Sequence, residues 1–169
     1  MRGLFTSLAV SLVLVALLAG LFVPSGAKAN DTVLWLQNSN LVVAARKALK
    51  NGDVARSIRL TRKAMKQKLT FSDLFSAYNN LCVAYSDLRL FDISLDYCER
   101  ALKLKTDWQL LNNRANAKLG LGKLDEAIAD YRAALELKPD ADVLKDNLEL
   151  ALQRKRLGIT TAPRRQDGV

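Results

Sequence analysis

The sequence predicts an all-α protein in which about three helix hairpins stack into a right-handed superhelix that ends in a C-terminal capping helix. An internal repeat is the first observation behind this fold class. Residues 75–107 align with residues 108–140 without a gap, and ten of the 33 aligned positions are identical. A period near 34 residues is typical of stacked helix pairs. The second observation is helical spacing of apolar residues, as at Ala127, Tyr131 and Ala134.

The first 29 residues have the pattern of an export signal. Arg2 precedes a stretch from Gly3 to Val23 without charge, and Ala27-Lys28-Ala29 follows. A positive start, an apolar stretch and an A-x-A site are typical of a secretory signal peptide, here cleaved after Ala29. The stretch is about 20 residues long, which also fits an uncleaved anchor in the inner membrane, although Pro24 favours cleavage. In both interpretations we expect the rest of the chain to be exported, to the bacterial periplasm.

The repeat divides the remaining chain into hairpins and a cap. A degenerate first unit spans residues 38–71, and clearer units span residues 75–107 and 108–141. Asp92 and Asp125 stand where second helices begin, which suits the positive end of a helix. Residues 142–157 predict a capping helix that covers the last apolar surface of the stack. Its polar outer face is expected at Lys145, Asp146, Glu149, Arg154 and Lys155. Residues 158–169 predict a disordered tail.

The two clearer units resemble the tetratricopeptide repeat family, whose pattern is W-x₂-L-G-x₂-Y, then A-x₃-F, then P. The stretch from Leu124 to Pro139 is a very close match. The unit before it matches through Tyr78, Leu81, Cys82, Tyr85, Ser94, Cys98 and Ala101. Arg114 and Lys118 depart from the pattern, which has Leu and an aromatic residue at these positions. The resemblance implies two antiparallel helices per unit and adaptor work in envelope assembly, secretion or the cell wall.

Composition excludes several kinds of catalytic site. The chain has no histidine, so it cannot form a Ser-His-Asp triad, a Cys-His pair or a metal site with histidine ligands. Its two cysteines cannot complete a Cys₄ zinc site or hold an iron–sulfur cluster alone. We therefore expect no metal and no cofactor, and we predict a non-catalytic module that binds a protein or peptide segment.

A row of asparagines marks the candidate binding site. Asn80, Asn113 and Asn147 are 33 and 34 residues apart and occupy the same position in three successive first helices. First helices line the concave face of such a stack, and an amide can pair with a peptide backbone whatever its sequence. The row resembles the asparagine ladder in the repeat domain of O-GlcNAc transferase, although many repeats carry Asn here whatever they bind. The expected partner contacts are Arg46, Asn79, Asn80, Val83, Asn112, Asn113, Asn116 and Asn147.

Positive charge is concentrated near one end of the chain. The net charge is +9, and residues 30–70 hold nine Lys or Arg against two Asp. Such a surface could dock on an anionic lipid or polymer of the envelope, which is the alternative to groove binding. A solvated helix face explains the same charges without a partner. Nucleic acid is not an expected partner, because an exported protein seldom meets it. The sequence indicates no oligomeric state.

Cys82 and Cys98 are expected to lie level with each other in facing helices of one unit. An exported location permits a disulfide between them. Two reduced, buried thiols that serve as small apolar side chains are the other interpretation. The sequence favours the reduced thiols, because disulfides between packed repeat helices are uncommon.

Overall fold

The computed structural model describes residues 29–160, with side chains from residue 40 onward. From Leu34 on, the chain forms one compact unit. Residues 1–28 of the expected signal peptide or anchor, and residues 161–169 of the expected tail, lie outside the described residues. None of the helices in the described part is long and apolar enough to cross a membrane.

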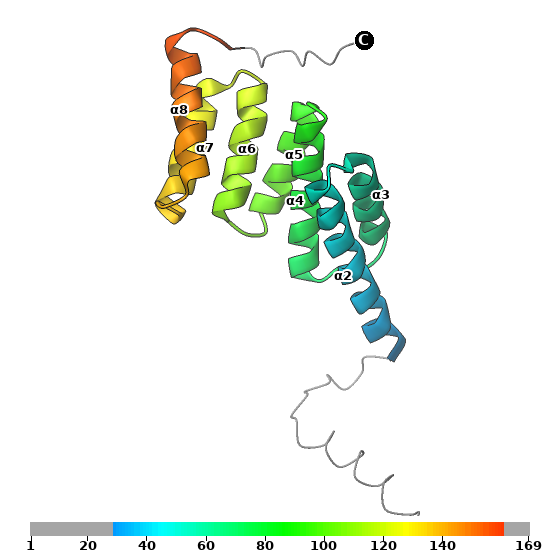
Figure 1. The fold of residues 1–169 in the computed structure, drawn as a ribbon. Coiled ribbons are helices and arrows are strands. Elements are labelled where there is room, and N and C mark those ends of the chain that lie inside the picture. The colour runs from blue at the N-terminus through cyan, green and yellow to red at the C-terminus, as the bar shows by residue number, and fades with distance from the viewer. Residues whose placement is uncertain (1–28, 161–169) are drawn as a thin grey trace, which may run out of the picture. The chain divides into compact units, whose positions relative to one another are not determined.

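Seven helices follow one another in the described part, and no strand lies between them (Figure 1). They are α2 (Ala29–Lys50), α3 (Val54–Met65), α4 (Phe71–Asp87), α5 (Phe91–Leu102), α6 (Trp108–Gly120), α7 (Leu124–Leu137) and α8 (Asp142–Arg156). Contacts follow chain order from α3 to α8, and α4 also touches α6. The predicted all-α stack of three hairpins and a final helix is therefore confirmed.

Polar caps fix where several helices begin. The side chains of Asp53, Thr70 and Asp107 accept hydrogen bonds from backbone N–H groups in the first turns of α3, α4 and α6. Because Thr70 caps α4, this helix begins at Phe71, ahead of the unit boundary expected at residue 75. No side chain caps α5 or α7, and acidic residues in their first turns face the positive helix end instead.

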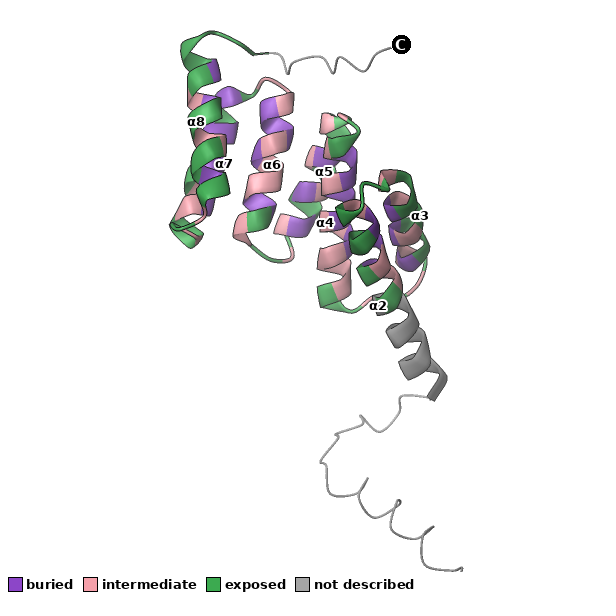
Figure 2. Cartoon of the chain, in the orientation of Figure 1, coloured by how far each residue is buried: buried purple, intermediate pink, exposed green. Residues whose placement is uncertain are grey.

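Small residues are buried within the hairpins, whose buried positions are coloured purple in Figure 2. Ala45 and Ala64 are fully buried in the first hairpin, and Ala115 and Ala127 are fully buried in the third. Tyr131 is the largest fully buried side chain and packs in the cluster that includes Ala115 and Ala127. Small side chains let two helix backbones approach closely, which is why they recur at these positions.

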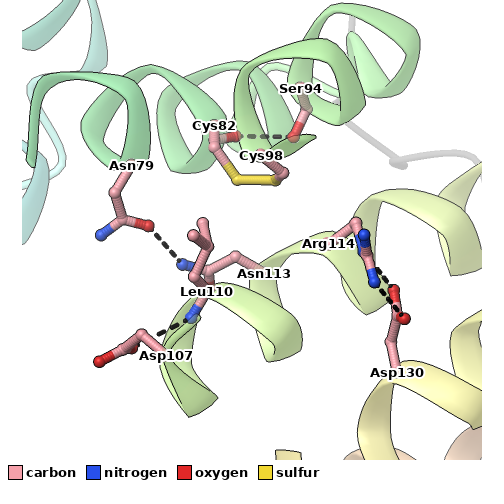
Figure 3. Close-up of a disulfide and its surroundings, with 9 residues drawn as sticks. All are labelled: Asn79, Cys82, Ser94, Cys98, Asp107, Leu110, Asn113, Arg114 and Asp130. Atoms are coloured by element: carbon pink, nitrogen blue, oxygen red, sulfur yellow. Dashed lines mark hydrogen bonds and ion pairs between the residues drawn. A yellow bond between two sulfur atoms is a disulfide. The ribbon is translucent and has the colours of Figure 1, made fainter. Parts of the chain in front are cut away.

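The middle hairpin contains a disulfide between Cys82 of α4 and Cys98 of α5, with 5.1 Å between the two Cα atoms (Figure 3). The expectation of two reduced thiols is therefore wrong. The physical reason is the close approach of the two helices, which brings the Cα atoms within the range that a disulfide can bridge. The Ser94 hydroxyl also donates to the Cys82 carbonyl oxygen at 2.7 Å, so that two links join these helices at one level.

The last helix, α8, caps the stack but departs from the expected pattern. Leu144 and Ala151 are fully buried, and Leu148 and Leu152 pack against the core of the third hairpin. Arg154, expected on the polar outer face, is instead only 8% exposed. Its guanidinium donates to the Thr160 carbonyl oxygen at 3.4 Å, because residues 158–160 turn back along the end of the helix.

Candidate functional site

The predicted asparagine row exists as a series of hydrogen bonds between successive first helices, α2, α4, α6 and α8. The Asn80 amide donates to the Val42 carbonyl oxygen at 3.1 Å. Asn113 donates to Asn79 Oδ1 at 3.0 Å, and Asn147 donates to Asn112 Oδ1 at 2.8 Å. Each donor thus binds the residue just before the matching row position of the preceding first helix. We call the side of the stack that carries this row the first-helix face.

The row begins differently at its N-terminal end. Val43 occupies the row position in α2, and Asn80 binds a backbone carbonyl because Val42 has no side-chain acceptor. Asn80 is only 3% exposed, so its amide cannot contact a bound partner. The expectation that Asn80 is a partner contact is therefore corrected: its amide joins the first two hairpins.

The remaining expected contacts reach the surface. Arg46 is exposed, and the other six, Asn79, Val83, Asn112, Asn113, Asn116 and Asn147, are half-buried. Val83 and Asn116 follow Asn79 and Asn112 by four residues, so they lie on the same helix face one turn further. Arg46 follows Val42 by the same spacing. The first-helix face therefore brings together the expected residues other than Asn80.

Neighbouring bonds orient three of the amides. The Oδ1 atoms of Asn79 and Asn112 accept hydrogen bonds from the row, and Oδ1 of Asn116 accepts one from the Tyr131 hydroxyl at 2.6 Å. An asparagine amide has two N–H donors besides its oxygen. The NH₂ groups of these three residues have no partner among the described residues, and Figure 3 shows the Asn79 nitrogen turned away from Asn113. The face therefore presents oriented, unpaired N–H donors.

The Tyr131 hydroxyl is a stable donor. Burial raises the pKa of Tyr131 far above its ordinary value, because the phenolate would lose its hydration. The neutral phenol therefore persists, and it holds Asn116 in one orientation. Sequence reasoning missed this contact, since Tyr131 reads only as a core residue.

An ionic cluster lies beside the row, between α6 and α7. Arg114 donates to both carboxylate oxygens of Asp130 at 2.7 Å (Figure 3). The Lys118 ammonium lies 2.9 Å from the same carboxylate. Lys118 and Asp130 are buried. Arg114 and Lys118 are the two departures from the repeat pattern, and Asp130 is their shared counter-ion. The sequence signal for this cluster was the pair Arg114 and Lys118, two cations one helical turn apart at positions where the repeat pattern has apolar side chains.

A hydrogen bond to a stacked tyrosine connects the first and second hairpins. The rings of Tyr85 and Tyr97 stack with centroids 5.6 Å apart, and Arg62 of α3 donates to the Tyr85 hydroxyl at 2.6 Å. This contact joins α3 to α4.

Among the described residues, no group of three or more Cys, Asp or Glu side chains is placed to hold a metal ion.

Family models match the two clearer repeat units of the chain. The tetratricopeptide repeat family model matches residues 108–141, and a second model of the same description matches residues 74–106. The chain contains two tetratricopeptide repeats. Such repeats serve in general as protein–protein interaction modules, and the fold is typically non-catalytic.

Two curated relatives share the repeats of this chain. Heat shock protein STI1 of Saccharomyces cerevisiae is 33% identical over 98 residues, which is 57% of this chain. Sperm-associated antigen 1 of Mus musculus is 37% identical over 73 residues, or 43% of this chain. The matched parts are only 16% and 8% of these two relatives, which are therefore much longer proteins.

Solved structures share the fold. The first tetratricopeptide repeat domain of human RPAP3 is 25% identical with a TM-score of 0.64, covering 71% of this chain and 93% of that domain. An O-GlcNAc transferase mutant of Thermobaculum terrenum is 22% identical with a TM-score of 0.66, covering 75% of this chain and 23% of the transferase. The second likeness concerns the fold alone.

Proposed function

We propose that this protein is a non-catalytic adaptor of the bacterial cell envelope that binds an extended segment of a partner protein on its first-helix face. The observation that carries the proposal is the set of unpaired N–H donors on Asn79, Asn112 and Asn116, each held by a hydrogen bond to its own oxygen. Stacked repeats of this kind curve, and the first helices line the concave side.

The chemistry of the face suits a peptide backbone. An extended peptide presents carbonyl oxygens that have no partner of their own, and amide N–H groups bind them whatever the side chains. The oxygens of Asn79 and Asn112 already accept one hydrogen bond each, so the N–H groups of these side chains are their unpaired groups for a ligand. Val83 offers an apolar contact between them, and Arg46 adds a positive charge at the N-terminal end of the face.

Two features support the envelope as the location. The chain begins with the pattern of a secretory signal peptide or an inner-membrane anchor. The Cys82–Cys98 disulfide suits an oxidising compartment such as the periplasm, whereas cytosolic proteins rarely keep disulfides.

A pull-down with a charge-matched control tests the binding face. The bait is the full chain in mild detergent, incubated with an envelope extract at moderate salt. The test variant is Asn79→Asp/Asn112→Asp, which keeps the oxygens that Asn113 and Asn147 need but replaces the free N–H donors with charges that repel carbonyl oxygens. The control, Ile93→Asp/Ala129→Asp, adds the same charge at exposed positions on the second helices α5 and α7, which carry no residue of the row.

The proposal predicts a protein that wild type and control retain and that the Asn79/Asn112 variant loses. Equal retention by all three baits would remove the first-helix face as the site. Retention only at low salt, again equal for all three, would point to charge attraction elsewhere on the chain, since exposed charges are screened by salt.

A further inference from the structure

The outer side of the first hairpin carries a surface of unpaired positive charge. We call it the α3 basic surface. Its residues are Lys47 of α2, Arg56, Arg59 and Lys63 of α3, and Lys66, which directly follows α3. All five are exposed, and none forms an ion pair within the described residues. Eight other Lys and Arg side chains, between residues 96 and 156, are paired with carboxylates. The first hairpin therefore differs from the rest of the stack.

Helical spacing aligns these charges. Arg56, Arg59, Lys63 and Lys66 follow one another at intervals of three or four residues, which places them on one face of the helix. The opposite face of α3 is buried at Ser57, Thr61 and Ala64. No residue of the asparagine row lies on α3, so a ligand here leaves the first-helix face open.

Two shallow hollows lie within the surface. One is lined by Ala55, Ile58, Arg59, Arg62, Lys63 and Lys66. The other is lined by Ala44, Lys47, Ala48, Asn51 and Arg56. Neither lining includes a carboxylate, and each combines cations with short aliphatic side chains. Arg62, which lines the first hollow, also donates to the Tyr85 hydroxyl at 2.6 Å.

The occupant that fits this chemistry best is a phospholipid surface. Lys and Arg side chains bind phosphate groups without further directional partners, and a helix face with one sign of charge can lie along a planar layer of them. The aliphatic residues in the hollows suit the less polar part of that layer. The charge-free stretch of residues 3–23 brings this chain to a membrane, during export or permanently.

We propose that the α3 basic surface docks on anionic phospholipid headgroups of the envelope membrane, an inference that rests on the envelope location proposed above. An acidic protein is the competing occupant. The lipid is favoured because the surface offers charge and aliphatic contact over a broad face, with Asn51 as the one uncharged polar side chain lining either hollow.

Vesicle flotation of the full chain tests this proposal. Binding is measured to vesicles of phosphatidylcholine alone and of phosphatidylcholine with phosphatidylglycerol, at low and moderate salt. The apolar N-terminal stretch contributes to both mixtures, so the increase caused by phosphatidylglycerol isolates the charge contribution. The test variant is Arg59→Gln/Lys63→Gln, and the matched control is Lys103→Gln/Arg132→Gln, which removes two exposed, unpaired charges from later hairpins.

We expect a phosphatidylglycerol-dependent increase that falls with salt. The Arg59/Lys63 variant should weaken that increase on the order of tenfold, and the control should leave it nearly unchanged. Glutamine is a good helix former, so both variants should keep the wild-type circular dichroism. The proposal is overturned if phosphatidylglycerol adds no binding, or if the two variants lose it equally. The first of these results would leave an acidic protein as the partner for the α3 charges.

Discussion

At the scale of single residues, the two departures from the repeat pattern explain each other. Arg114 and Lys118 stand where the family usually has apolar side chains, and both reach Asp130 across the α6–α7 contact. Desolvation of three charged groups offsets much of their attraction, so the cluster specifies a pairing more than it adds stability. Removing Asp130 is costly, because Arg114 then has no counter-ion and the buried Lys118 keeps only Glu126, at 3.6 Å.

This cluster makes a sharp prediction for stability. Asp130→Ala should lower the free energy of unfolding by about 3 kcal/mol, since it leaves Arg114 without a counter-ion and Lys118 with only the exposed carboxylate of Glu126. The triple variant Arg114→Leu/Lys118→Tyr/Asp130→Ala restores the side chains of the family pattern and should recover most of that loss. Urea unfolding followed by circular dichroism measures both. Equal losses in the single and triple variants would show that the ion pairs themselves stabilise this hairpin.

The roles of single residues were harder to predict from the sequence than the helices or the fold class. The periodicity placed Asn80, Asn113 and Asn147 in one row, and the hydrogen bonds follow that row. Spacing alone could not show that Asn80 is buried, because burial depends on how closely α2 and α4 approach. Arg154 was misplaced for a similar reason: the chain after α8 turns back over it, which a helical pattern does not encode.

At the scale of helices, the units are held by close approaches at small residues. Gly120 ends α6 against the Phe91 ring of α5, and a Cβ atom there would lie 2.6 Å from ring carbons. Alanine is normally the better helix former by about 1 kcal/mol. Here the ring must move to admit the added methyl group, and overpacking of this kind costs about 1–3 kcal/mol.

Gly120→Ala should therefore destabilise the protein by about 1 kcal/mol, against the direction of helix propensity. In a Phe91→Leu background the same change should become neutral or stabilising, because the smaller side chain makes room. Thermal unfolding of the four proteins measures the coupling. A stabilising effect of Gly120→Ala in the wild-type background would mean that α5 and α6 do not approach this closely.

The middle hairpin has a covalent link that the others lack. The Cys82–Cys98 bond closes a loop with a sequence separation of 16 residues. A loop of that length corresponds to about 3 kcal/mol of stabilisation, mainly through restriction of the unfolded chain. Close helix packing was predictable from the repeat, but whether the thiols are joined depends on the redox state, which a repeat pattern does not specify.

The Cys82→Ala/Cys98→Ala variant should accordingly unfold at a lower urea concentration than oxidised wild type. Its free energy of unfolding should be lower by about 3 kcal/mol. Reductant should lower the stability of wild type and leave the variant unchanged. Mass spectrometry after alkylation in denaturant without reductant provides the matching chemical test, because unfolding exposes both cysteines and a disulfide keeps them unalkylated. Full alkylation of native protein taken from cells would contradict the disulfide.

At the scale of the whole molecule, the chain separates two kinds of surface. The first helices carry the amide row, and the outer side of the first hairpin carries the α3 basic surface. The fold class was predictable because each hairpin must bury its apolar stripe against its neighbours. The first hairpin is the weakest match, and it buries the hydroxyls of Ser57 and Thr61 without a partner.

The most direct test of the central claim is photo-crosslinking from one side chain on the first-helix face and, as a control, from one exposed side chain on a second helix. A benzophenone amino acid replaces Val83 on the first-helix face or Ile93, an exposed residue of α5, and the protein is irradiated in its own cells. We predict an adduct with a partner protein from position 83 and none from position 93. An adduct from position 93 together with none from position 83 would contradict binding on the first-helix face.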